Sequence, residues 1–214
     1  MVASMTQMSS RDALLDCALD LLIRHGYRGA SFGDIATALG MTRANIHYHF
    51  GSKQALVEEV LARYVDETLA ALRGIWLANG QTFEERVEQM LQFSLSRFRR
   101  YNRRGSKAHS WSLISRLRQD AELLSLAGRT QLQRFSRELE AILTNALSAD
   151  VARGTFSADT PIAAIAAQLA LIADNASAII IDPAGAHHLE AVYRGFADMV
   201  KRGFGHPAPR RRTR

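Results

Sequence analysis

A short run near the start of the chain, GMTRANIHYHFGSKQAL over residues 40–56, gathers side chains that can recognise a nucleic acid. Arginine pairs with guanine edges, asparagine pairs with adenine edges, and hydroxyl groups bond to phosphate oxygens. Lysine at the start of a helix can meet a phosphate together with free backbone N–H groups. We therefore predict DNA contacts from a set of seven side chains: Ser31, Thr42, Arg43, Asn45, His47, Tyr48 and Lys53. The alternative is that His47 and Tyr48 only cover a seam between domains.

The elements that must position these side chains follow a helix-turn-helix pattern. Ser31 can cap a short helix, with Asp34 three residues later as an imperfect capping box, and Gly40 ends that helix. Thr42 can cap a second helix over 43–49. In helix-turn-helix proteins the second helix enters the major groove of DNA. The pattern therefore predicts that residues 43–49 form the helix that reads the operator.

Helical spacing divides the four consecutive rings of this run between the inside and the outside. Ile46 and Phe50 lie four residues apart, so they share one face, which we expect to point inward. Arg43 and His47 project elsewhere. Two of the four ring positions are then core or nearly core, and two are available to a partner outside.

The run ASFGDIATALGMTRANIHYHFGSKQALVEEVL resembles the N-terminal DNA-binding domain of TetR-type transcriptional regulators. Two departures are mild, since Met41 replaces the usual valine and His47 stands where tyrosine is common. The close resemblance covers about residues 10–62, and it implies that the rest of the chain is a helical domain that senses a ligand and dimerises. The matching positions are Asp34, Ile35, Ala36, Gly40, Thr42, Ile46, His49, Phe50, Ser52, Lys53 and Leu56.

Nearly every segment has apolar residues at helical spacing, which predicts an all-α fold. We expect a flexible arm over 1–9, the helix-turn-helix domain over 10–55, a helical ligand-binding and dimerisation domain over 56–204, and a disordered basic tail over 205–214. A glycine at 128 suggests that 121–148 is two helices. The predicted helices are 10–25, the two short ones, a long one from 53, and 82–101, 107–118, 121–148, 160–181 and 186–203.

Positive charge is unevenly distributed along a chain whose formal net charge is +6. A net positive charge favours a polyanionic partner without identifying it. Residues 97–118 contain basic side chains and no acidic one, and we treat them either as a solvated surface or as a stretch that attracts DNA. The stretch contains Arg97, Arg99, Arg100, Arg103, Arg104, Lys107, Arg116 and Arg118.

The predicted helix over 160–181 is apolar nearly all round, which is typical of a helix buried on several sides. Its many alanines allow another helix to approach closely, so we predict a homodimer interface there. The resemblance adds that the last two helices pair with their two-fold mates in a four-helix bundle. The predicted interface residues are Ala163, Ala166, Ala167, Ala170, Ala173, Tyr193 and Phe196.

A small-molecule pocket is implied by the resemblance rather than by any motif. It would lie between the middle helices, and the ligand would shift the protein toward a spacing of the DNA-binding domains that does not fit the operator. The long helix from 53 is the natural lever, since it joins the two domains. Aromatic and Met side chains at helical spacing are more often plain core, which is the alternative interpretation. The candidate lining residues are Met90, Phe98, Trp111, Phe135, Leu139 and Asn175.

Other functions have less support in the sequence. We find no spacing of metal ligands, no phosphate-binding glycine loop and no nucleophile motif, so we predict no catalytic residue, no metal and no cofactor. Two rivals remain, a helical protein-interaction module without specific DNA binding and a transcriptional activator of the same fold. The single cysteine, Cys17, permits no intramolecular disulfide, and we find no membrane span, so we expect a cytoplasmic protein.

Overall fold

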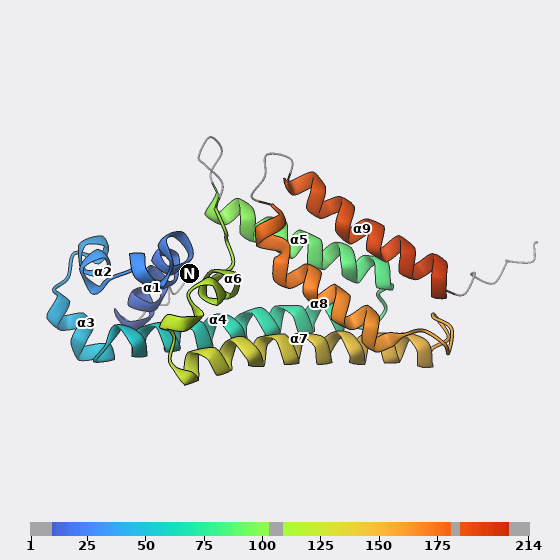
Figure 1. Cartoon of the computed structure of the whole chain (residues 1–214), viewed down its shortest axis with the longest axis horizontal. Coiled ribbons are helices and arrows are strands. Elements are labelled where there is room, and N and C mark those ends of the chain that lie inside the picture. Colours follow the sequence, from blue (N-terminus) through green and yellow to red (C-terminus); the bar gives the residue numbers. More distant parts are fainter. Residues whose placement is uncertain (1–9, 103–108, 181–184, 206–214) are drawn as a thin grey trace, which may run out of the picture.

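The computed structural model describes residues 10–102, 109–180 and 185–205, and this part of the chain is α-helical (Figure 1). The only β pairing in these ranges is an isolated bridge between Phe156 and Gly205, so the prediction of an all-α fold is confirmed. The predicted arm, nearly all of the tail, and Arg103, Arg104 and Lys107 lie outside these ranges. The helices are α1 (Ser10–Gly29), α2 (Phe32–Leu39), α3 (Arg43–Phe50), α4 (Lys53–Trp76), α5 (Phe83–Tyr101), α6 (Leu113–Gln119), α7 (Leu126–Ala152), α8 (Ile162–Ile179) and α9 (Gly185–Phe204), with a 3₁₀ turn at Ala121–Leu123.

Local capping signals explain where the short N-terminal helices begin and end. The Ser31 and Thr42 side chains accept the backbone N–H groups of residues 34 and 45, and Asp34 completes the capping box by accepting from the Ser31 backbone. Gly40 ends α2 in the left-handed conformation, at a φ of 64°. These caps satisfy N–H groups that have no partner within the helix. They define α2 and α3 as two separate helices joined by a tight turn.

The predicted stop of the first helix near residue 25 is a kink rather than an end. Gly26 has a φ of 70° inside α1, a conformation that favours glycine. The next residue, Tyr27, donates its backbone N–H to the Asp120 carboxylate at 2.8 Å, and Arg116 donates to the Arg24 carbonyl at 3.1 Å. A Cβ on Gly26 would lie 2.7 Å from an Asp120 oxygen. The kink therefore lets α6 and the turn after it dock against α1.

The two longest helices, α4 and α7, run side by side along the molecule (Figure 1). At the end away from α2 and α3, α5 packs against α4, α8 packs against α7, and α9 lies against α5 and α8. The predicted boundary between residues 55 and 56 falls inside α4, which continues through it without a break. Ion pairs of Arg134 with Asp66 and of Arg73 with Glu138 join α4 to α7. These ion pairs hold the second half of α4 against α7.

Two predicted helix boundaries are wrong. Residues 109–112 are not helical, and α6 begins only at Leu113, where the Ser112 side chain accepts the Ser115 N–H. Gly128 does not divide a helix, because it lies in the first turn of α7 and donates its N–H to the Ser125 hydroxyl at 3.0 Å. A glycine among the first N–H groups of a helix interrupts no intrahelical bond.

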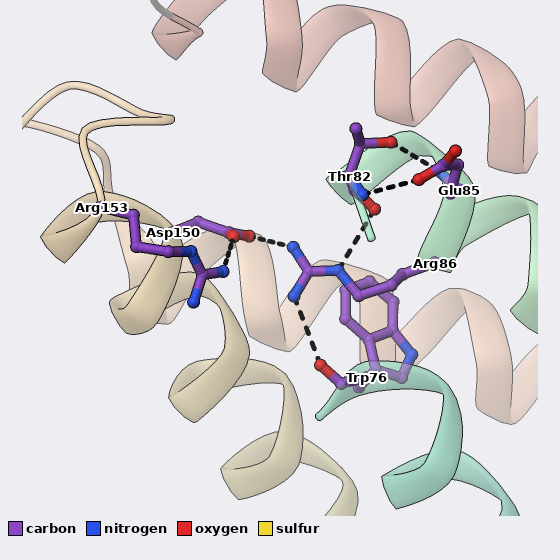
Figure 2. Close-up of polar contacts among 6 residues, drawn as sticks. All are labelled: Trp76, Thr82, Glu85, Arg86, Asp150 and Arg153. Atoms are coloured by element: carbon purple, nitrogen blue, oxygen red, sulfur yellow. Dashed lines mark hydrogen bonds and ion pairs between the residues drawn. The ribbon is translucent and has the colours of Figure 1, made fainter. Parts of the chain in front are cut away.

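A buried ion pair joins three helix ends at the far end of the molecule (Figure 2). Arg86 and Asp150 are each 2% exposed and form a charged hydrogen bond. Arg86 also donates to the carbonyl oxygens of Trp76 and Thr82, at 3.3 Å each, and Arg153 donates to the other Asp150 oxygen at 2.6 Å. These contacts tie the end of α4 to the start of α5 and the end of α7.

Candidate nucleic-acid interface

Helix α3 presents opposite faces to the core and to the outside. Ile46 is fully buried and Phe50 nearly so, as their spacing predicts. Arg43, Asn45 and Tyr48 are exposed, and α3 lies with α2 at one end of the molecule (Figure 1). The apolar pair fixes the helix while the polar face stays open to a large partner.

The four consecutive rings have four different surroundings. Tyr48 is 87% exposed and Phe50 is buried. The His47 ring meets the Phe32 ring edge-on at 4.7 Å between centroids, and its Nδ1 lies 3.1 Å from the Gly51 carbonyl oxygen. His49 is half-buried beside Tyr48. The tyrosine is therefore the ring that extends freely from this surface, and His47 is held by its neighbours.

The hydroxyl groups of Ser31 and Thr42 already serve as helix caps. Hydrogen bonds from Ser31 lower the pKa of the Asp34 carboxyl, which keeps a negative charge at the start of α2. Arg43 lies close to this helix, since a Cβ on Gly33 would come within 2.6 Å of its Nη2. We therefore expect Ser31 and Thr42 to act mainly by setting the angle between α2 and α3.

Lys53 stands in the first turn of α4, where Ser52 caps the helix. Its Nζ lies 4.7 Å from the centroid of the Tyr27 ring, and partial burial lowers the pKa of this ammonium group. A cation on an aromatic face beside free N–H groups suits a phosphate oxygen. The phosphate contact predicted for Lys53 stays a prediction that this geometry allows.

Comparisons with known proteins assign this domain. A family model described as bacterial regulatory proteins of the tetR family matches residues 14–60. Residues 14–60 therefore match the N-terminal domain of the TetR family of transcriptional regulators. The family consists of transcriptional regulators rather than enzymes.

Two curated relatives each match less than half of the chain. The HTH-type transcriptional repressor KstR2 of Rhodococcus jostii (strain RHA1) is 32% identical over 84 residues, which make up 39% of this chain and 41% of that protein. The HTH-type transcriptional repressor ComR of Escherichia coli (strain K12) is 38% identical over 60 residues, 28% of this chain and 29% of that protein. The matched region thus spans less than half of these relatives.

Solved structures share the fold over nearly the whole chain. The reduced form of Escherichia coli NemR has a TM-score of 0.73 at 18% identity, and a TetR transcriptional regulator from Legionella pneumophila has a TM-score of 0.72 at 21% identity. Each comparison covers 94% of this chain and 100% of the other. The TetR fold therefore extends beyond the DNA-binding domain.

The residues predicted for a dimer interface fall into two groups. Ala166, Tyr193 and Phe196 are buried within this chain, so they cannot form the outer surface of a contact between subunits. Ala163 and Ala167 are exposed, whereas Ala170 and Ala173 are partly covered. The exposed stripe of α8 also includes a residue that the sequence argument passed over, Leu171, which is 64% exposed.

Helix α8 is also the one helix in the described ranges that is long and apolar enough to cross a membrane. Only 33% of the helix over Ile162–Ile179 is buried in the single chain. Core helices of soluble proteins meet the same criteria of length and composition. What bears on function is that α8 has an apolar face that no other part of the described chain covers.

The candidate ligand residues are also divided. Trp111 and Phe135 line a crevice inside the second domain. Met90 and Leu139 are buried in the core, Phe98 packs against the core, and none of them lines the crevice. Asn175 is exposed and donates to the Leu171 carbonyl, so it also lies outside this lining. Its neighbour Asp174 lines the crevice instead.

The basic stretch over 97–118 forms no single surface in its described part. Arg97 turns inward toward α4, Arg116 binds the α1 carbonyl described above, and Arg118 pairs with Asp174 at 2.9 Å. Arg99 and Arg100 remain exposed. Three of these cations therefore make contacts between helices of the chain. In the ranges described, no group of three or more His, Cys, Asp or Glu side chains could hold a metal ion.

Proposed function

We propose that the chain is a dimeric repressor that binds a pseudo-palindromic operator through α3 and is released by a small-molecule effector. One observation supports this most strongly. Arg43, Asn45 and Tyr48 project from a helix that Ile46 anchors in the core. That is the arrangement a recognition helix needs to place side chains against base edges. The relatives KstR2 and ComR are transcriptional repressors, which favours repression over activation.

The dimer is proposed from the exposed face of α8. Ala163, Ala167 and Leu171 follow each other at one helical turn, and Met199 of α9 is also exposed. Small residues let a second helix approach closely, and a two-fold axis would relate two recognition helices to two operator half-sites. Leu171→Glu should then give monomers in sedimentation velocity and lose operator binding at concentrations where the native chain binds. A dimer that survives this substitution contradicts the proposed face.

The operator experiment selects duplexes from a random pool at about 150 mM salt, where non-specific phosphate attraction is already weakened. The native chain should enrich an inverted repeat. The Arg43→Ala/Tyr48→Ala variant should bind the selected duplex at least about 30-fold more weakly, since each of the two base contacts contributes about 1–3 kcal/mol. Its stability should not change, because both side chains are exposed.

The matched control is Arg137→Ala, which removes an exposed arginine of α7, outside the helix-turn-helix. This variant should select the same repeat with the native affinity. Equal losses in the control and in the α3 variant would show that general positive charge, rather than α3, carries the binding.

We place the effector in the crevice of the second domain. Tyr64, Thr68 and Leu72 bring α4 into its wall, and Trp111 and Ser112 bring in the segment just before α6. The helix that begins at the DNA surface therefore also contributes to the crevice. A ligand that alters the packing of α4 there would bias the placement of the DNA-binding domain.

A further inference from the structure

The crevice is small and has mixed polarity. Its volume is about 30 Å³, which is about the share of one molecule in liquid water. Leu72, Ile114 and Phe135 supply apolar wall, and Phe93 and Arg97 are among the lining residues that remain partly exposed. Any ligand larger than water must therefore displace side chains, and Phe93 is a lining residue that can move without opening the buried core.

Arg97 is the unusual charge in this lining. Its Nη1 donates to the Tyr64 hydroxyl at 2.7 Å and to the Thr68 hydroxyl at 3.1 Å. Its Cζ lies 4.6 Å from the centroid of the Tyr64 ring and 4.7 Å from that of the Phe93 ring. Stacking and two hydroxyls hold the guanidinium in place, yet they leave its positive charge uncompensated.

Three other partly covered arginines have carboxylate partners. The side chains of Arg63, Arg118 and Arg134 are 26–32% exposed, and each forms an ion pair with an aspartate. Within the described residues, no carboxylate lies at ion-pairing distance from Arg97. A guanidinium that is fixed, partly desolvated and unpaired is ready to accept a carboxylate in a bidentate contact.

Two further polar atoms at the crevice have no partner. Trp111 is 4% exposed and its Nε1 donates to nothing in the described chain, and Asp174 Oδ1 is likewise buried and unpartnered. Leaving such groups unsatisfied is unfavourable, so a water or a ligand is expected to bind them. The other Asp174 oxygen pairs with Arg118, which neutralises that carboxylate and leaves Arg97 as the excess charge.

We propose that the crevice binds a small organic carboxylate with an apolar body. The carboxylate would take the free N–H groups of Arg97, and the body would lie against Leu72, Phe93 and Phe135. The Trp111 N–H would donate to a second oxygen of the ligand. This inference rests on the proposed function, since it names the chemical class of the effector.

The test uses the full chain and a panel of acids matched with their uncharged amides: phenylacetate with phenylacetamide, 3-phenylpropanoate with its amide, and octanoate with octanamide. Calorimetric titration measures binding, and the affinity for the selected duplex is measured with and without each compound. At least one acid should bind and weaken duplex binding, whereas its amide should bind about 10- to 100-fold more weakly, the range expected for a lost charge-assisted hydrogen bond.

Variants then locate the contact. Arg97→Gln should lose binding of the acid by a similar factor, and Trp111→Phe, which keeps a ring but removes the N–H, should lose less. Arg99→Gln is the matched control, because it removes an exposed arginine from the same helix. It should bind the acid as the native chain does. Unchanged duplex affinity of each variant without ligand shows that it is folded.

Several results would overturn the inference: no acid binds, an amide binds as tightly as its acid, or Arg97→Gln binds the acid normally. If the native chain selects an operator but ignores every acid, the carboxylate class fails while the regulator stands. If an acid binds through Arg97 but does not change duplex affinity, the site stands and its role as the effector site in the proposed function fails.

Discussion

Two arginines on helix α5 show how the same side chain can serve different purposes. Arg86, in the first turn, is buried and pairs with Asp150. Arg97, in the last turns, is half-buried and meets only hydroxyls and rings. Both stack on an aromatic side chain, since Arg86 lies 5.6 Å from the centroid of Trp76. The presence or absence of a carboxylate partner is what separates them.

The difference follows from desolvation. A buried charge is tolerated only when hydrogen bonds and an opposite charge compensate for lost water. Asp150 and two carbonyl oxygens compensate the buried charge of Arg86. This arginine therefore has a structural role, since it holds α4, α5 and α7 together. Nothing comparable satisfies Arg97, which keeps some contact with solvent. A fixed cation of this kind is available to a ligand.

The largest effect on stability should come from breaking the ion pair between Arg86 and Asp150. Asp150→Ala leaves Arg86 buried without its partner, and we expect the free energy of unfolding to fall by about 3–5 kcal/mol. Urea denaturation followed by circular dichroism measures this. Arg153→Ala is the control, because Arg153 is exposed and should contribute at most about 1 kcal/mol. Similar losses for the two variants would contradict the assignment of Arg86 as the anchored charge.

Replacing both members of the pair sharpens the same point. The variant Arg86→Met/Asp150→Leu removes both charges and keeps side-chain volume, so it should be more stable than Asp150→Ala. Buried ion pairs can often be exchanged for apolar residues with little loss of stability. If the double variant unfolds as easily as the single one, packing rather than unpaired charge explains the loss.

A much smaller effect on stability is expected at the other arginine. Arg97→Gln gives up two hydrogen bonds to hydroxyls but leaves no charge unpaired, so the free energy of unfolding should fall by only about 1 kcal/mol. The same urea titration measures it. A loss as large as that of Asp150→Ala would show that Arg97 is a structural anchor too, and the contrast between the two arginines would disappear.

The smallest effect concerns pH and Asp174. Burial raises the pKa of this carboxyl above its ordinary value, against the opposing effect of Arg118. The folded state therefore holds the proton more tightly than the unfolded state. This group makes the protein more stable at low pH, and that contribution is lost as pH rises from the ordinary pKa through the raised one. Asp174→Asn should reduce the slope of stability against pH in that window, and an unchanged slope would exclude Asp174 as its source.

The DNA-binding half could be predicted well from sequence because its signals are local. Ser31, Gly40 and Thr42 act on backbone groups within a few residues, and they set the two short helices as expected. The inward face of Ile46 and Phe50 follows from helical spacing alone. The role of Gly128 was misjudged because the rule that glycine interrupts a helix depends on where the helix begins, and the Ser125 cap sets that start.

The arrangement of the second domain could not be predicted in the same way, because it depends on contacts between distant segments. Spacing indicates which residues share a helix face, but it does not say what covers that face, so Ala166, Tyr193 and Phe196 proved to be covered by their own chain. Charge composition likewise grouped Arg97 with Arg116 and Arg118. In the structure these three side chains bind three different partners. By itself the sequence determined most of the helices, the inward and outward faces of α3 and the resemblance to a family. Only the tertiary structure decided which charges are paired, because ion pairs and cavities form between residues that are remote along the chain.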